Sequence, residues 1–119
     1  MTNAAEIAEI YIAAWNETDP AARHNIIADT WTADAVYVDP LAAVEGHEGL
    51  AALIGGVQER FPGFRFALIG QPDGHGEHVR FSWGLGPEGQ QPPIKGTDYV
   101  RVEDGRLKSV TGFLDLVPA

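Results

Sequence analysis

Residues 94–117 read IKGTDYVRVEDGRLKSVTGFLDLV, two runs of strand-forming residues on either side of the pair Asp104-Gly105. An Asp-Gly pair in this setting favours a two-residue type I′ turn, because both central positions of that turn need a positive φ angle. The stretch therefore predicts an antiparallel hairpin, with one strand over residues 94–102 and a second over residues 106–117.

The register of this hairpin decides which side chains share a face of the sheet. With a two-residue turn, Asp98 faces Thr111 and Ile94 faces Asp115, and side chains alternate between the two faces. A carboxylate among apolar neighbours is unfavourable unless it is paired, protonated or directed into a cavity. We therefore expect Asp98 and Asp115 on the concave side of a curved sheet. The full expected face comprises Asp98, Val100, Val102, Leu107, Ser109, Thr111, Phe113 and Asp115.

The rest of the chain predicts three helices and three further strands. The helices are expected over residues 4–16, from the cap Asp19 and Pro20 through Trp31, and from about residue 47 to 61; the strands are expected over 35–38, 64–69 and 77–85. Residues 70–74 (GQPDG) predict a turn. Consecutive strands with short connections indicate an antiparallel meander, and segregated helices indicate the α+β class. The expected fold is one α+β domain over residues 1–119, a cone of three helices on a strongly curved antiparallel sheet.

Composition narrows the classes of partner. The chain of 119 residues has a formal net charge of −9, which argues against nucleic acid or an anionic membrane as a partner, because both select basic surfaces. It contains no cysteine, so disulfides and thiolate metal sites are excluded. The N-terminus lacks the pattern of a signal peptide, and no apolar run approaches the roughly 20 residues of a membrane span. We therefore expect a cytoplasmic protein.

The histidines do not predict a metal site. His75 and His78 are close in sequence, but they lie where a turn enters a strand, and no third ligand follows at a usual interval. A surface turn explains them better, and we expect neither a metal nor another cofactor.

Several short sequences carry a family resemblance. Residues 37–40 (YVDP) precede a glycine and the third expected helix, and the hairpin contains GTDY at 96–99, DGR at 104–106 and FLD at 113–115. This order and these phrases resemble the nuclear transport factor 2-like superfamily, in its SnoaL-like branch. That branch includes polyketide cyclases and adjoins the ketosteroid isomerases. The resemblance covers nearly the whole chain and implies the cone-shaped fold, whereas the superfamily hosts many functions on this one scaffold.

The resemblance to ketosteroid isomerases implies specific roles. Tyr11, Asp39 and Asp98 fall where that family has a tyrosine on the first helix, an aspartate after the first strand and an aspartate on the penultimate strand. Asp39 would then be the general base, while Tyr11 and a protonated Asp98 would form the oxyanion hole. Ketosteroid isomerase is itself the standard example of a neutral aspartic acid that donates a hydrogen bond in this way. Asp115 matches the acid–base aspartate on the last strand of SnoaL-type cyclases.

The match to steroid isomerases is incomplete. Those enzymes place further tyrosines near the positions of Trp31 and Ile54, and neither residue offers a hydroxyl. Steroid isomerisation is therefore not expected, whereas a related proton transfer remains open. We expect a pocket lined by aromatic and aliphatic side chains, with these candidate residues: Trp15, Trp31, Tyr37, Ile54, Phe66, Trp83 and Phe113.

Three functions remain open from the sequence. The first is a cofactor-independent acid–base enzyme, of isomerase or cyclase type, acting on a small apolar substrate with a carbonyl group; Asp39, Asp98 or Asp115 would move the proton and Tyr11 would polarise the carbonyl. The second is a binder of lipophilic small molecules that uses the same pocket. The third is a protein-interaction module. A sheet face with Tyr99, Arg101, Val110 and Leu114 further predicts a homodimer.

Overall fold

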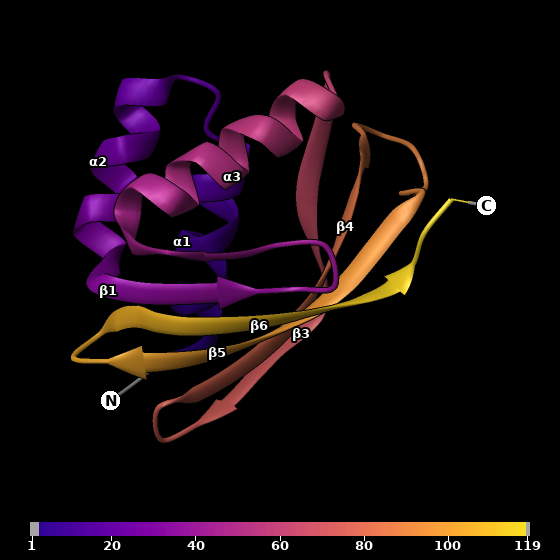
Figure 1. Cartoon of the computed structure of the whole chain (residues 1–119). Helices are drawn as coiled ribbons and strands as arrows, with labels where there is room; N and C mark the ends of the chain where they lie inside the picture. The colour runs from indigo at the N-terminus through magenta and orange to yellow at the C-terminus, as the bar shows by residue number, and fades with distance from the viewer. Residues whose placement is uncertain (1–2, 119) are drawn as a thin grey trace.

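The computed structural model describes residues 3–118, which form three helices and a six-stranded sheet. In chain order, the elements are α1 (Ala4–Asn16), α2 (Pro20–Thr30), β1 (Trp31–Val38), β2 (Ala43–Glu45), α3 (Gly46–Arg60), β3 (Phe64–His75), β4 (His78–Pro87), β5 (Ile94–Glu103) and β6 (Arg106–Leu116). The helices lie on one side of a strongly curved sheet, which bends around them like the wall of a cone (Figure 1). The α+β cone expected from the sequence is confirmed.

The sheet is mixed rather than antiparallel throughout. Its strand order is β2-β1-β6-β5-β4-β3, and β1 runs parallel to β6 while every other neighbouring pair is antiparallel. The expectation of a purely antiparallel sheet is therefore wrong for this pair. The chain leaves β1 through β2 and α3 and returns only with the last strand, and such a long connection allows parallel pairing.

The helix boundaries follow from their capping residues. Asn3 caps α1 by accepting a hydrogen bond from the backbone amide of Glu6, and Asp19 caps α2 by accepting one from Ala22. Pro20 occupies the first position of α2, where its missing N–H costs nothing. The first two helices are confirmed, except that Trp31 begins β1 instead of continuing α2.

Two strand predictions need correction. The three-residue strand β2 was not expected, and residues 70–74 continue β3 instead of forming a turn. The register of β3 with β4 shifts between Ile69 and Asp73. The segment with Gly70 and Pro72 therefore forms an irregularity within one long strand and does not end it. The turn itself follows at Gly76, whose φ is 56°.

The β5–β6 hairpin has the expected turn but not the expected register. Asp104 and Gly105 have φ angles of 51° and 79°, and Val102 pairs with Leu107. Arg101 then pairs with Ser109, so Lys108 is an extra residue that forms a β-bulge. Asp98 consequently faces Gly112, and the predicted pairing of Asp98 with Thr111 is wrong.

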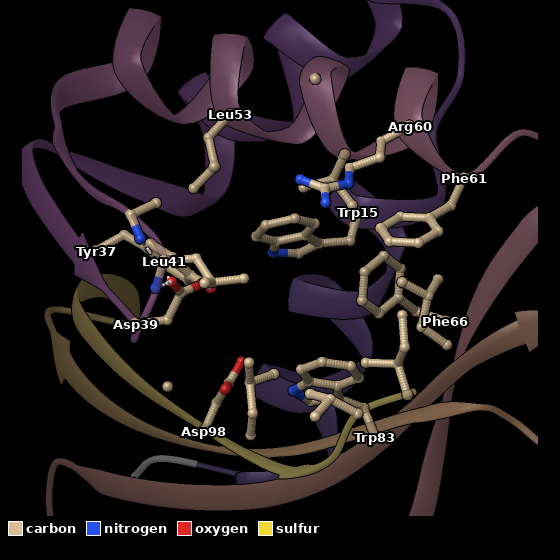
Figure 2. A pocket seen from close by; sticks show the side chains of 18 of the residues that line it. Trp15, Tyr37, Asp39, Leu41, Leu53, Arg60, Phe61, Phe66, Trp83 and Asp98 are labelled. Atoms are coloured by element: carbon tan, nitrogen blue, oxygen red, sulfur yellow. Dashed lines mark hydrogen bonds between the residues drawn. The ribbon is translucent and has the colours of Figure 1, made fainter. Parts of the chain in front are cut away.

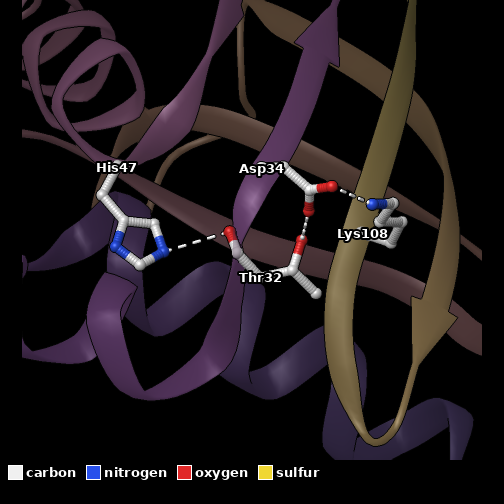
Figure 3. Close-up of polar contacts among 4 residues, drawn as sticks. All are labelled: Thr32, Asp34, His47 and Lys108. Carbon is white, nitrogen blue, oxygen red and sulfur yellow. Dashed lines mark hydrogen bonds and ion pairs between the residues drawn. The ribbon is translucent and has the colours of Figure 1, made fainter.

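Polar contacts hold the bulge against β1 (Figure 3). The Lys108 ammonium lies 2.5 Å from the Asp34 carboxylate, which also accepts a hydrogen bond from the Thr32 hydroxyl at 3.0 Å. The ammonium lowers the pKa of Asp34. His47 Nε2 lies 3.1 Å from the backbone oxygens of Trp31 and Thr32. These contacts occur where the register between β1 and β6 also shifts, so the two irregularities are accommodated together.

Candidate functional site

A cavity of about 760 Å³ lies between α3 and the inner face of the sheet. Figure 2 shows Leu53 and Arg60 along its upper side, Tyr37 and Asp39 on one flank, and Asp98 and Trp83 below. A cavity of this size is typical of sites for small organic ligands. The remaining lining includes Tyr11 and Trp15 from α1, Phe66 from β3, Leu85 from β4, Ile94 from β5, and Gly112 and Leu114 from β6.

Aromatic side chains form much of the inner wall. The ring centroids of Trp15 and Phe66 are 5.3 Å apart, those of Phe66 and Trp83 are 5.2 Å apart, and those of Trp15 and Tyr37 are 5.7 Å apart. Such tilted and edge-on contacts stabilise the rings against one another. Trp83 lies across Gly96 on β5, where an added Cβ would come within 2.3 Å of the indole. The wall is therefore apolar and closely packed.

Three donors surround the carboxyl group of Asp39. Its Oδ2 accepts a hydrogen bond from the Tyr37 hydroxyl at 2.5 Å, and its Oδ1 accepts from the backbone amides of Leu41 and Ala42 at 2.7 and 2.8 Å. These bonds all favour the charged form and fix its orientation. Because each carboxylate oxygen can accept two hydrogen bonds, Oδ2 retains one free acceptor position.

Asp98 has the opposite environment. It is 1% exposed, and neither carboxylate oxygen has a hydrogen-bond partner within the described part of the chain. Burial raises the pKa of Asp98 to about 6, and the negative charge of Asp39 acts in the same direction. The Tyr11 hydroxyl and the Trp83 indole partly offset this effect. Asp98 therefore keeps its proton to a higher pH than an ordinary aspartate does.

Gly112 makes the approach of these groups possible. A Cβ atom at this position would lie 2.8 Å from Asp98 Oδ1, 3.3 Å from Asp39 Cβ and 3.6 Å from the Tyr37 hydroxyl. All three side chains therefore converge on the space that a side chain at residue 112 would occupy. The two tyrosines near these carboxylates also have raised pKa values. Burial and the charge of Asp98 raise the pKa of Tyr11. Burial and the hydrogen bond to Asp39 raise the pKa of Tyr37.

The structure brings together most of the residues predicted for the site. Tyr11, Asp39 and Asp98 line the cavity, together with these predicted wall residues: Trp15, Tyr37, Phe66, Trp83 and Phe113. Phe113 is 57% exposed and lies at the rim.

Three predicted site residues lie elsewhere. Asp115 is exposed and accepts a hydrogen bond from the Thr97 hydroxyl at 2.6 Å. The pairs Gly96–Leu114 and Lys95–Leu116 leave it as an extra residue at a second irregularity of β6, so it does not share the face of Asp98. Trp31 and Ile54 are completely buried in the core and do not reach the cavity.

Sequence reasoning missed one side of the cavity. Leu53, Gly56, Val57 and Arg60 all line it from α3. Their spacing of three and four residues is the signal that could have identified a common face of the helix. Gly112 was not predicted because it contributes to the site through its lack of a side chain. No sequence motif indicates a contribution of that kind.

Residues 3–118 offer neither a metal-binding cluster nor a membrane-spanning helix. No group of three or more histidine, aspartate or glutamate side chains in this range is placed to hold a metal ion. None of the helices described has the length and apolar character needed to cross a bilayer.

Comparison with known proteins relates this architecture to one family. The family model of the SnoaL-like domain matches residues 8–110. A candidate isomerase of the SnoaL-like family from Agrobacterium tumefaciens is 45% identical, with a TM-score of 0.91 over 97% of this chain and 99% of that chain. Curated protein sequences gave no match.

More distant structures show the same fold. A candidate ketosteroid isomerase from Kribbella flavida is 17% identical, with a TM-score of 0.71 over 98% of this chain and 80% of that chain. A candidate SnoaL-like polyketide cyclase from Jannaschia is 18% identical, with a TM-score of 0.71 over 97% of this chain and 90% of that chain.

Proposed function

The chain belongs to the SnoaL-like domain family, and from this we propose that it is a cofactor-independent acid–base enzyme acting on a small apolar carbonyl compound. The observation that carries the proposal is the contrast between two carboxylates in one cavity. Asp39 accepts three hydrogen bonds, whereas Asp98 is buried with none. Environments that separate the protonation states of two acids in this way are typical of acid–base pairs.

The proposed step is a proton transfer from carbon. Asp39, through the free acceptor position of Oδ2, removes a proton from the carbon next to the carbonyl group. The electrons of the broken C–H bond form a C=C bond, and the carbonyl π electrons move to oxygen. The protonated Asp98 and the Tyr11 hydroxyl donate hydrogen bonds to that oxygen. In a β,γ-unsaturated substrate, Asp39 then returns the proton to the γ-carbon; the C=C bond moves into conjugation as the oxygen electrons re-form the carbonyl, which completes an isomerisation.

The apolar walls support this role. Low-polarity surroundings strengthen the hydrogen bonds to the developing oxyanion and protect the intermediate from water. The same cavity would suit a binder of lipophilic molecules, with the aspartates as hydrogen-bond anchors. In that case Asp39 and Asp98 would affect affinity, and no proton would exchange with solvent.

The proposal is tested by solvent exchange, which needs no knowledge of the natural substrate. A panel of β,γ-unsaturated ketones and other apolar ketones in D₂O is followed by ¹H NMR for enzyme-dependent loss of the α-proton signal. We expect Asp39→Asn to slow exchange by about 10²–10⁴-fold, because an amide cannot accept the proton. Glu9→Gln makes the same carboxylate-to-amide change at an exposed position of α1 outside the cavity and should leave the rate unchanged.

The pH profile separates the two carboxylates. If Asp98 acts as a proton-bearing donor, kcat/KM falls as the pH rises through about 6, the pKa of Asp98 in the free protein. Asp98→Asn should remove this alkaline limb, because its amide donates at every pH. A rate that instead rises through pH 6 would refute the assignment of Asp98 as donor, and ligand binding without exchange would favour the binder.

We further propose that the protein is a cytoplasmic homodimer that pairs through the outer face of the sheet. Exposed apolar side chains on this face are Val36, Val38, Ile69 and Tyr99. Val110 and Leu114, which were expected there, instead belong to the core and the cavity. Exposed apolar side chains gathered on one sheet face favour association.

A further inference from the structure

Arg60 stands out among the residues of the cavity. All eight lysines and arginines of the chain lie in its described part, and Arg60 is the one that lines the cavity. Figure 2 shows its guanidinium turned toward the cavity near Trp15 and Phe61, on the α3 side, away from Asp98. Its guanidinium carbon lies 5.8 Å from the centre of the Phe61 ring.

The guanidinium makes no ion pair and no hydrogen bond with another described residue. Within residues 3–118, the ion pairs are Arg80–Asp73 and Lys108–Asp34, and no hydrogen bond from Arg60 to another described residue is present. Arg23 is a useful contrast, because it is buried and donates to the backbone of Glu17 and to the Gln58 side chain. Arg60 therefore has donors available at the mouth of the cavity.

The residues beside Arg60 leave the mouth open. Ala52, Gly56 and Arg60 follow one another at four-residue intervals on α3, and all three are exposed and line the cavity. A Cβ atom on Gly56 would meet no atom within 4 Å. A ligand that enters past this open stretch of α3 comes within reach of the guanidinium.

We propose that the ligand of this cavity is an apolar organic acid whose carboxylate binds Arg60 at the mouth while its carbonyl end lies near Asp39 and Asp98. This inference rests on the proposed function and specifies its substrate class. An arginine presents a planar set of donors that matches a carboxylate with two parallel hydrogen bonds. The reverse orientation would place the ligand's carboxylate beside the carboxylate of Asp39, which like-charge repulsion disfavours.

A structural role for Arg60 also has to be considered. It is the last residue of α3, where a positive charge stabilises the end of a helix. That role would alter the stability of the protein, but it would not distinguish an anionic ligand from a neutral one of the same shape. A pair of probes that differ only in charge therefore separates the two roles.

The probes are 1-anilinonaphthalene-8-sulfonate and N-phenyl-1-naphthylamine, which share a fluorescent ring system but differ by an anionic group. For Arg60→Gln we expect the affinity for the sulfonate to fall about tenfold, which corresponds to one charge-assisted contact of about 1.4 kcal/mol. The affinity for the neutral probe should change less than about twofold. Arg60→Lys should retain most of the sulfonate affinity, since it keeps the charge.

Arg65→Gln is the matched control. Arg65 is also exposed and close in sequence, but it does not line the cavity, so both affinities should be preserved. Shifts of the Gly56 and Gly112 amide signals in ¹H–¹⁵N spectra will locate the probes. Equal weakening of both probes by Arg60→Gln, equal effects of the Arg60 and Arg65 variants, probe signals away from the cavity, or no binding of either probe would overturn the inference.

The inference and the proposed function can fail separately. Proton exchange on neutral ketones that is lost in Asp39→Asn but unaffected by Arg60→Gln, together with equal binding of both probes, would retain the enzyme and refute the acid ligand. Selective sulfonate binding without proton exchange on any keto acid or neutral ketone would support Arg60 as an anion anchor and refute catalysis.

Discussion

Replacing Asp98 with asparagine should stabilise the protein at alkaline pH and not at acid pH. The pKa of Asp98 is raised from 3.8 to about 6, which corresponds to roughly 3 kcal/mol of differential free energy. Between these two values the folded protein binds the proton more tightly than the unfolded chain does. The free energy of unfolding of the wild type therefore falls as the pH rises from about 4 to about 6, and above that range the whole cost of the buried charge remains.

The Asp98→Asn variant isolates this cost. The new amide cannot ionise, but in its buried position it would lack partners just as the carboxylate does, at a cost of about 1–3 kcal/mol. That cost is the same at every pH, so it cancels when two pH values are compared. We expect the difference in unfolding free energy between Asp98→Asn and wild type to become more favourable by about 2–3 kcal/mol from pH 4 to pH 8.

The measurement is urea unfolding monitored by tryptophan fluorescence, at one protein concentration because association would affect apparent stability. Glu9→Gln is the control, since it makes the same carboxylate-to-amide change at an exposed position of α1 that does not line the cavity. A pH-independent difference for Asp98→Asn, or a variant that is less stable at pH 8 by more than at pH 4, would refute the reasoning. Either result would mean that Asp98 is stabilised as an anion.

Three further predictions follow from the same geometry. Tyr37→Phe removes the 2.5 Å hydrogen bond to Asp39; it should lower the unfolding free energy by about 1–2 kcal/mol in urea unfolding, and an unchanged stability would contradict this. Gly56→Ala should add about 0.5–1 kcal/mol by stabilising α3, whereas Gly56→Leu should narrow the mouth and weaken binding of N-phenyl-1-naphthylamine; equal binding would place the entrance elsewhere. Val38→Glu, on the outer face and 45% exposed, should convert the dimer to a monomer in sedimentation velocity, and a wild-type monomer at high micromolar concentration would refute the dimer.

Local sequence signals predicted most of the fold because they act over a few residues. Asn3, Asp19 and Pro20 define helix starts through their own hydrogen bonds and ring geometry, and Asp104-Gly105 defines a turn through its φ angles. The parallel pairing of β1 with β6 could not be predicted in this way, because it depends on how the intervening chain crosses the molecule. Trp31 illustrates the same limit, since its spacing fits α2 while tertiary packing places it in β1.

The residues of the cavity likewise include some that local sequence signals could predict and others that depend on tertiary structure. The aspartates and aromatic residues could be proposed from their types and from the order of the strands, whereas the contribution of α3 required knowing which helix covers the open end of the cone. Two of the predicted wall residues, Trp31 and Ile54, are large and apolar but lie deeper than the cavity. Residue type alone does not distinguish a core position from a cavity wall, because both remove apolar surface from water.

The bulge at Lys108 determines which carboxylate belongs to the site. Without it, strict alternation from Asp104-Gly105 would place Thr111 opposite Asp98 and turn Asp115 inward. With it, Gly112 lies opposite Asp98, and Asp115 points outward to Thr97. The sequence contains a trace of this change, because Leu107 and Val110 are separated by two polar residues instead of one. Only glycine at position 112 leaves the space on which Asp39, Asp98 and Tyr37 converge. One inserted residue in the last strand thus gives Asp98 its unpartnered environment, on which the proposed chemistry depends.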